Sequence, residues 1–170
     1  VVEAEVLRLE PAEDVVTILG VDLYAESGVR HWNSPARGEP EADWATKLVV
    51  TPGTCAVAAT QLEKLGAEPG DTLSFRSGGR RFDLQVVGVL PERDTVDTRR
   101  FASIVLTDIA TAQECLEREG RISRIDVTLD DDEEIARLRS ALPEGVRLEP
   151  TGSRQSALER MTAAFELNLR

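Results

Sequence analysis

The sequence is poor in the residue types that carry most enzyme chemistry and most nucleic-acid binding. It has one histidine, His31, two cysteines and only 4% aromatic residues. A single histidine cannot supply both a general base and the ligands of a zinc site. With 20 Lys and Arg against 31 Asp and Glu, the formal net charge is -11. This balance argues against a nucleic-acid partner and against binding to anionic lipid headgroups.

The two cysteines, Cys55 and Cys115, are too few for a disulfide framework and lack the spacing of a zinc or redox motif. We expect two small, buried, apolar side chains. A disulfide between them stays open as the alternative, because connectivity cannot be read from sequence.

Catalytic motifs are missing as well. The sequence has no G-x-S-x-G, no glycine-rich phosphate loop before a helix and no H-E-x-x-H. The acidic run 130–134 lacks the pattern of a calcium loop and suits the start of a helix. The segment 77–81 (SGGRR) is explained by a hairpin turn. We therefore expect neither enzyme activity nor a metal or cofactor.

No apolar run approaches the roughly 20 residues that a membrane-spanning helix needs, and no signal peptide is recognisable. The sequence begins without Met inside a predicted strand and stops inside a predicted helix. We expect the natural protein to continue on both sides.

Residues 101–129 form the most clearly patterned stretch. An apolar strand at 104–106 is followed by Asp108, which can cap a helix. Apolar residues then recur at helical spacing over 109–116, and Gly120 suits the helix end. Residues 125–129 alternate between apolar and polar, which predicts a half-buried strand.

The remaining pattern predicts further strands and helices. Strands are expected at 2–9, 15–19, 48–50, 72–76, 82–90 and 146–148. Helices are expected after a Thr54 cap up to Leu65, at 131–142 and at 153–170. Gly88 inside a strand indicates a bulge.

This order predicts an α+β fold with a βαβ-rich core lobe and an inserted, mostly antiparallel β lobe. The core lobe comprises residues 1–44 and 100–170, and the insert, with one helix, comprises 45–99. We expect the insert to have its own small core, built from Ala58, Leu62, Phe75, Phe82 and Val86.

The long connection 24–46 is a candidate for partner contact, because Arg30, Trp32 and Trp44 are residue types enriched at binding hot spots. The alternative is that the two rings only fix a long loop to the core.

The predicted last helix is a candidate for membrane coupling. Its apolar positions are Leu158, Met161 and Phe165, and the stripe broadens at Leu169. An ordinary amphipathic terminal helix is the alternative.

Four segments resemble the extracytoplasmic core domain of FtsX/MacB-type ABC transporter permeases, most closely permeases with two FtsX-like modules. They are GVDLYAES, LVVTPGTCAVAATQLEKLGAEPGDTLSF, FDLQVVGVLPERDT and SIVLTDIATAQECLEREGRISRIDVTL. The resemblance implies the MacB-like two-lobed fold. It also implies a position between two membrane helices of a permease, on the periplasmic or outer side of the cell membrane.

The resemblance further implies that the domain transmits motion from a cytoplasmic ATPase, without binding ATP itself. Its expected partners are the transmembrane helices of the same permease, that ATPase acting at a distance, and an exported substrate or an extracytoplasmic protein. The alternative function is a stand-alone extracytoplasmic ligand-binding α+β domain, which would need an apolar pocket with convergent polar groups.

Overall fold

The computed structural model describes residues 1–10, 13–25, 44–90, 92, 101–129 and 131–150. The chain divides into two compact units, Val1–Val127 and Thr128–Arg170, which are described separately. In the first unit the strands are β1 (Val2–Glu10), β2 (Asp14–Val21), β3 (Thr54–Ala58), β4 (Thr72–Ser77), β5 (Arg80–Leu90) and β6 (Ile104–Asp108). Its helices are α1 (Trp44–Val50), α2 (Ala59–Leu65) and α4 (Ile109–Cys115).

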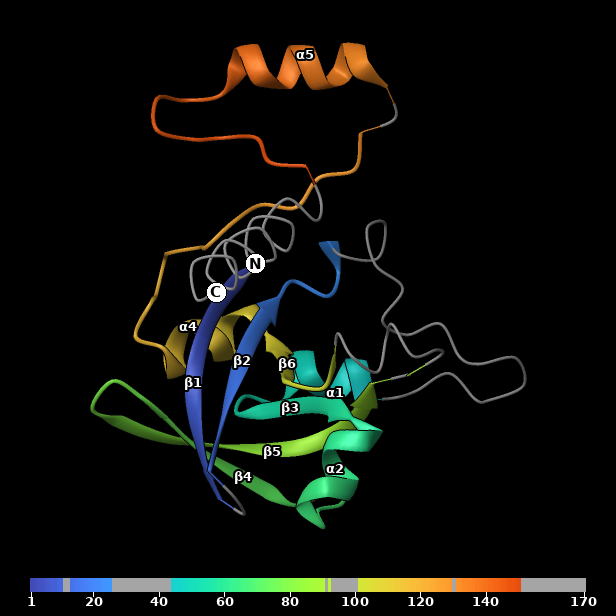
Figure 1. Cartoon of the computed structure of the whole chain (residues 1–170), viewed down its shortest axis with the longest axis vertical. Helices are drawn as coiled ribbons and strands as arrows, with labels where there is room; N and C mark the ends of the chain where they lie inside the picture. The colour runs from blue at the N-terminus through green and yellow to red at the C-terminus, as the bar shows by residue number, and fades with distance from the viewer. Residues whose placement is uncertain (11–12, 26–43, 91, 93–100, 130, 151–170) are drawn as a thin grey trace, which may run out of the picture. The chain divides into compact units, whose positions relative to one another are not determined.

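The six strands close into a barrel in the order β1-β2-β6-β3-β5-β4 (Figure 1). The pairs β2–β6 and β3–β5 are parallel, whereas β1–β2, β1–β4, β3–β6 and β4–β5 are antiparallel. The chain is thus a mixed α/β domain, and the predicted combination of parallel and antiparallel pairing is confirmed. A closed sheet removes most of the unpaired strand edges that an open sheet would expose.

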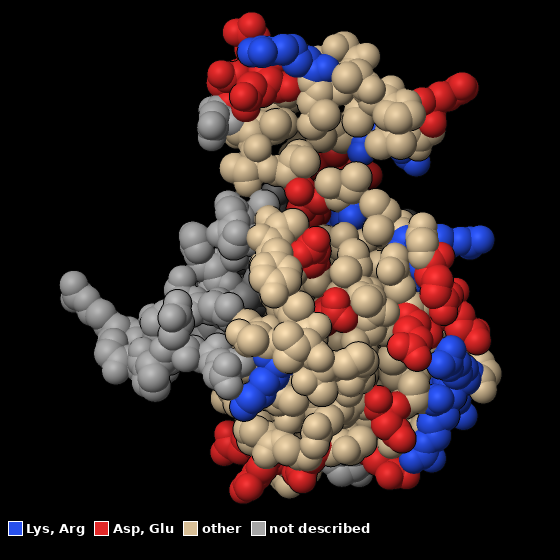
Figure 2. Space-filling view, turned by 180° about the vertical axis from the view of Figure 1, so that it is seen from behind, with Lys and Arg blue, Asp and Glu red and all other residues tan. Residues whose placement is uncertain are grey.

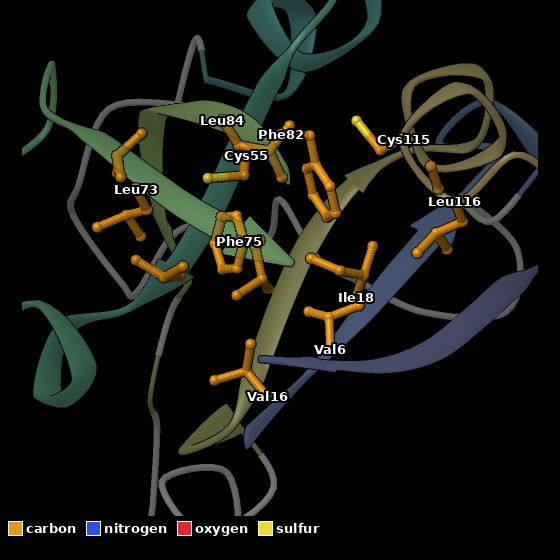
Figure 3. Close-up of a cluster of buried hydrophobic side chains, with 14 of the residues drawn as sticks. Val6, Val16, Ile18, Cys55, Leu73, Phe75, Phe82, Leu84, Cys115 and Leu116 are labelled. Carbon is orange, nitrogen blue, oxygen red and sulfur yellow. The ribbon is translucent and has the colours of Figure 1, made fainter. Parts of the chain in front are cut away.

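One hydrophobic core fills the barrel. Alternate residues of β1, β2, β4 and β5 point inward, as the period of two requires. Figure 3 shows these side chains converging, with Phe75 and Phe82 among them. The two rings are stacked, and their centroids are 5.5 Å apart. The members of this core include Val6, Val16, Ile18, Cys55, Leu73, Phe75, Phe82, Leu84, Val86 and Val105.

A second apolar layer lies on the outside of β2, β3 and β6. There α1 packs on β5, β3 and β6, and its residues Trp44 and Leu48 share one cluster with Leu19, Leu90 and Leu106. A strand that is covered on both faces has apolar residues at nearly every position, because the side chains on both faces are buried. This explains the sequences VVTILGV, TCAVA and IVL.

The helix α4 covers another part of the core and begins as predicted. The Asp108 carboxylate caps it by accepting from the backbone N–H groups of Ala110 and Thr111 at 3.1 and 2.9 Å. Ala112 then packs so closely on Gly20 of β2 that a Cβ at Gly20 would lie 2.2 Å from the Ala112 Cβ. Glycine is therefore required here for contact between helix and strand.

Two predicted elements in the middle of the chain are wrong. Residues 48–50, predicted as a strand, belong to helix α1, and residues 55–58, predicted as the start of a helix after the Thr54 cap, belong to β3. A short apolar run does not distinguish a buried helix from a buried strand, and the packing around the barrel decides between them. Thr54 caps no helix, since its hydroxyl donates to the Thr51 carbonyl at 2.7 Å.

The cap of α2 comes from far along the chain. Ala58 at the N-cap has no side-chain acceptor. Instead, the Glu92 carboxylate accepts from the backbone N–H of Thr60 at 3.0 Å and from its hydroxyl at 2.8 Å. The helix ends at Gly66, which has a φ of 60°, as predicted.

The strands predicted at 125–129 and 146–148 are not formed in the described residues. Ile125 is 74% exposed, Val127 49% and Val146 53%. Alternation favours a strand only where a neighbouring edge and an apolar surface are available to pair with it. The predicted strand–helix–strand unit is thus reduced to β6 and α4.

The expectation of a separate core in the insert is also wrong. Leu62, Phe75, Phe82 and Val86 are buried, but they share one core with β1, β2 and β6. The boundaries of the two lobes stay a prediction.

Other predictions are confirmed. The strands β4 and β5 form the hairpin predicted from the segment 77–81, and the strands predicted at 2–9 and 15–19 are present as the antiparallel pair β1–β2. The register between β3 and β5 shifts at the position facing Val86 and Gly88, which is the predicted irregularity. A Cβ at Gly88 would lie 2.6 Å from the Trp44 side chain, so the indole ring rests directly on this backbone.

The described residues of the second unit contain α5 (Asp132–Ala141). Its predicted cap is confirmed, because the Asp131 carboxylate accepts from the backbone N–H of Glu134 at 2.8 Å. The acidic residues Asp132, Glu133 and Glu134 occupy the first turn, where the helix dipole favours negative charge. No residue of α5 is fully buried.

Substituting Gly20 by Ala tests the contact between α4 and β2. We expect Gly20→Ala to lower the free energy of unfolding by about 1–3 kcal/mol, because the added methyl group overpacks against Ala112. Urea unfolding of the chain measures it. Adding Ala112→Gly removes the clash, so the double variant should recover part of the lost free energy of unfolding. The recovery is reduced by about 1 kcal/mol, which glycine costs inside a helix. Gly79→Ala, in open space, is the control, and an equal loss there would contradict the contact.

Candidate functional site

The candidate site is the place where the chain comes into the barrel and leaves it. We define the chain junction as residues 1–3, at the start of β1, together with residues 118–127, which follow α4. After α4, Glu117 has a positive φ of 54° and Gly120 a φ of 68°. These two left-handed residues reverse the chain, and the following segment returns to the start of β1.

Backbone hydrogen bonds close the junction. The Ser123 N–H donates to the Val1 carbonyl at 2.9 Å, and the Val1 nitrogen donates to the Arg124 carbonyl at 3.0 Å. Side chains add to these contacts. The Ser123 hydroxyl accepts from the Glu3 N–H at 3.0 Å and donates to the Glu3 carbonyl at 3.2 Å, while the Arg118 guanidinium donates to the same carbonyl at 2.9 Å. Residues more than 100 positions apart are thereby held side by side.

Arg124 is the electrostatic centre of the junction. Its guanidinium forms ion pairs with Glu3 and with Asp126, the latter with a distance of 2.9 Å between Nε and Oδ1. The side chains of Arg124 and Asp126 are only 27% and 20% exposed. A half-buried cation between two carboxylates is screened less by salt than a surface pair, so these contacts stabilise the junction.

The sequence pattern does not predict the junction. From the alternation alone, Arg124 and Asp126 are expected only at the polar positions of a strand. The signal was weak, because nothing in a sequence couples Glu3 to residues near 124. Ile122 and Ile125 of the same segment are 53% and 74% exposed.

Of the residues predicted for partner contact, the structure describes only Trp44. Trp44 is 7% exposed and its side chain packs on Gly88, which favours the alternative that this tryptophan anchors the connection to the barrel. Arg30 and Trp32 lie outside the described residues, as do the predicted coupling residues Leu158, Met161, Phe165 and Leu169.

Both cysteines are free and buried in the barrel core, which favours the apolar interpretation over the disulfide. Burial raises the pKa of the Cys55 thiol, and the neighbouring Cys115 raises it further. Burial, with a smaller contribution from Glu114, raises the pKa of the Cys115 thiol. Both groups therefore stay protonated at neutral pH and are poor nucleophiles.

Arg8 is the one arginine among the buried residues of the described chain. It is 4% exposed and forms an ion pair with Asp14 at 3.6 Å. Desolvation lowers its pKa and the Asp14 carboxylate opposes that effect. In the β1–β4 register it lies opposite Phe75, which gives it a structural position at the barrel wall.

The described residues contain no group of three or more histidine, cysteine, aspartate or glutamate side chains placed to hold a metal. Within the second unit, an open hollow of about 440 Å³ is lined by residues 139–149. All of its walls come from one continuous segment, the end of α5 and the turn after it. It thus lacks the convergent polar groups from separate elements that a ligand pocket needs.

Comparison with known proteins relates the whole chain to transporter permeases. Residues 2–144 match the MacB-like periplasmic core domain. The chain is also 28% identical over 169 residues to an uncharacterized ABC transporter permease protein of Mycobacterium tuberculosis, covering 99% of this chain. It spans 19% of the length of that relative.

Removing the Arg124 guanidinium should loosen the junction. We expect Arg124→Ala to cost about 1 kcal/mol locally, since two carboxylates lose their counter-ion. The backbone N–H of Ser123 should then exchange with solvent about fivefold faster, which amide hydrogen exchange by NMR measures. Arg121→Ala, at an exposed neighbouring position, is the control. Equal rates in both variants would show that the ion pairs do not hold the junction.

The buried Cys55 thiol predicts a loss of stability at high pH. A folded-state pKa raised above the unfolded value of about 8.5 adds stability that is present below that pH and lost above it. We expect the free energy of unfolding to fall by about 1.4 kcal/mol per pH unit above pH 9 from this group. Urea unfolding between pH 7 and 10 should show a shallower fall in Cys55→Val. Parallel pH profiles would contradict the buried thiol as the cause.

Proposed function

The chain belongs to the family of MacB-like periplasmic core domains, and we propose that it is the extracytoplasmic domain of an ABC transporter permease subunit. In this proposal the domain lies between two membrane helices of the permease. It transmits motion driven by a cytoplasmic ATPase to an exported substrate or an extracytoplasmic protein, and it performs no catalysis and needs no cofactor.

The chain junction is the observation that supports this proposal best. Val1 and Arg124 are hydrogen-bonded, so the polypeptide reaches and leaves the barrel at one place. This arrangement suits a domain inserted into a membrane protein, because the barrel is entered and left on one side. A stand-alone domain has no such requirement.

The composition agrees with a location outside the membrane. No helix among the described residues is long and apolar enough to cross a bilayer. The surface of the described barrel is rich in charge, and the whole chain carries a net charge of -11. In the proposal, the two membrane helices on either side of the domain attach it to the membrane.

The predicted helix over 153–170 would be the mechanical connection to the membrane, since a continuous helix resists bending better than a loop. In the complete permease, two glycines inserted near Asn168 should uncouple transport from ATP hydrolysis while the isolated 170-residue chain keeps its stability. Transport and ATPase activity are measured together in reconstituted vesicles.

Two alanines inserted at the same point are the matched control, because they add the same length and continue a helix. We expect the alanine variant to keep more coupling than the glycine variant. Unchanged transport in the glycine variant, or equal loss in both, would contradict transmission through a stiff helix.

A further inference from the structure

The β4–β5 hairpin carries a concentration of positive charge on an otherwise acidic protein. We define the basic hairpin as residues 72–84, with Arg76, Arg80 and Arg81 near its turn. Arg76 and Arg81 are opposite each other in the ladder and both are exposed, while their neighbours Phe75 and Phe82 point into the core. Alternation therefore places both guanidinium groups on the outer face, where like charges directly opposite each other destabilise a sheet.

Neighbouring carboxylates compensate this charge only in part. Arg81 forms an ion pair with Glu10 at 3.2 Å, but both side chains are more than half exposed. In the part of the chain that the structure describes, Arg76 forms no ion pair. Figure 2, seen from behind, shows Lys and Arg side chains gathered at the edge where the hairpin projects.

The hairpin also has an open backbone edge. β5 pairs with β3 only from Gln85 onward, opposite Thr54. Residues 80–84 pair with β4 on one side and with no described strand on the other. Such an edge can accept a further extended segment through backbone hydrogen bonds.

The hairpin is held in place before any partner arrives. Arg80 donates to the Glu114 carbonyl at the end of α4 at 3.2 Å and forms an ion pair with Glu117 at 3.5 Å. The turn itself uses Gly78 with a φ of 57°. A fixed edge loses less conformational entropy on binding than a mobile one.

We propose that the basic hairpin is a docking site for an acidic, extended segment of a partner protein. The segment adds to the open edge of β5 and places carboxylates against Arg81 and Arg76. Asp83, on the same outer face and hydrogen-bonded to Ser74 at 2.6 Å, directs these carboxylates toward the turn. Extended polyanions such as nucleic acid are disfavoured, because Glu10 and Asp83 flank the arginines and the chain is acidic.

Titration of the 170-residue chain with an N-acetylated, C-amidated hexaglutamate peptide tests the proposal. NMR spectra at low ionic strength should show shifts concentrated in residues 76–83. Arg76→Glu should weaken binding about tenfold, and added salt should weaken it in the parent protein. Arg76→Glu replaces a like-charge pair by an opposite one, so it should unfold no more easily than the parent.

Arg147→Glu, an exposed position in the second unit, makes the same change of charge and is the matched control. Full peptide binding by this variant supports docking at the basic hairpin. A loss of binding equal to that of Arg76→Glu would show that only the net charge matters and would overturn the proposal. Absence of peptide binding overturns the proposal. Binding to vesicles containing phosphatidylserine but not to the peptide also overturns it, in favour of a lipid surface. Because the isolated chain is used, the result is independent of the permease proposal.

Discussion

Closure of the six-stranded sheet is the constraint on which the rest of the structure depends. Closing the barrel requires β1 to pair with β4, although the two strands are more than 60 residues apart in the chain. It also requires a core whose side chains match the enclosed space, which the stacked Phe75 and Phe82 rings and small aliphatic residues provide. The contact of Ala112 with Gly20 then decides how closely α4 approaches, since no side chain fits between them.

The sequence predicted elements whose pattern is set by local chemistry. The β4–β5 hairpin alternates strictly around a Gly-Gly turn, and the cap and apolar stripe of α4 lie within a few residues of each other. These features depend on backbone conformation and on one buried face, both of which are visible in a short window. The same holds for Asp131 at the start of α5.

What the sequence did not predict depends on contacts between distant residues. Leu48 lies in a run that would suit a strand, but it is buried as part of a helix on the outside of the barrel. Ile125 and Val127 have the alternation of a strand but no neighbouring ladder in the described structure. The junction is the strongest case, because Glu3 and Arg124 become partners only after the barrel has brought the start of β1 next to the end of α4.

The end of α4 links the basic hairpin to the chain junction. Arg80 of the hairpin contacts Glu114 and Glu117, and Arg118, the next residue, donates to the Glu3 carbonyl in the junction. Glu117 itself has a φ of 54°, although it is not a glycine. A left-handed conformation at such a residue costs free energy that the surrounding contacts must offset. Arg80 and Arg118 thus hold the conformation of this one turn from its two sides, and the turn connects the hairpin to the junction.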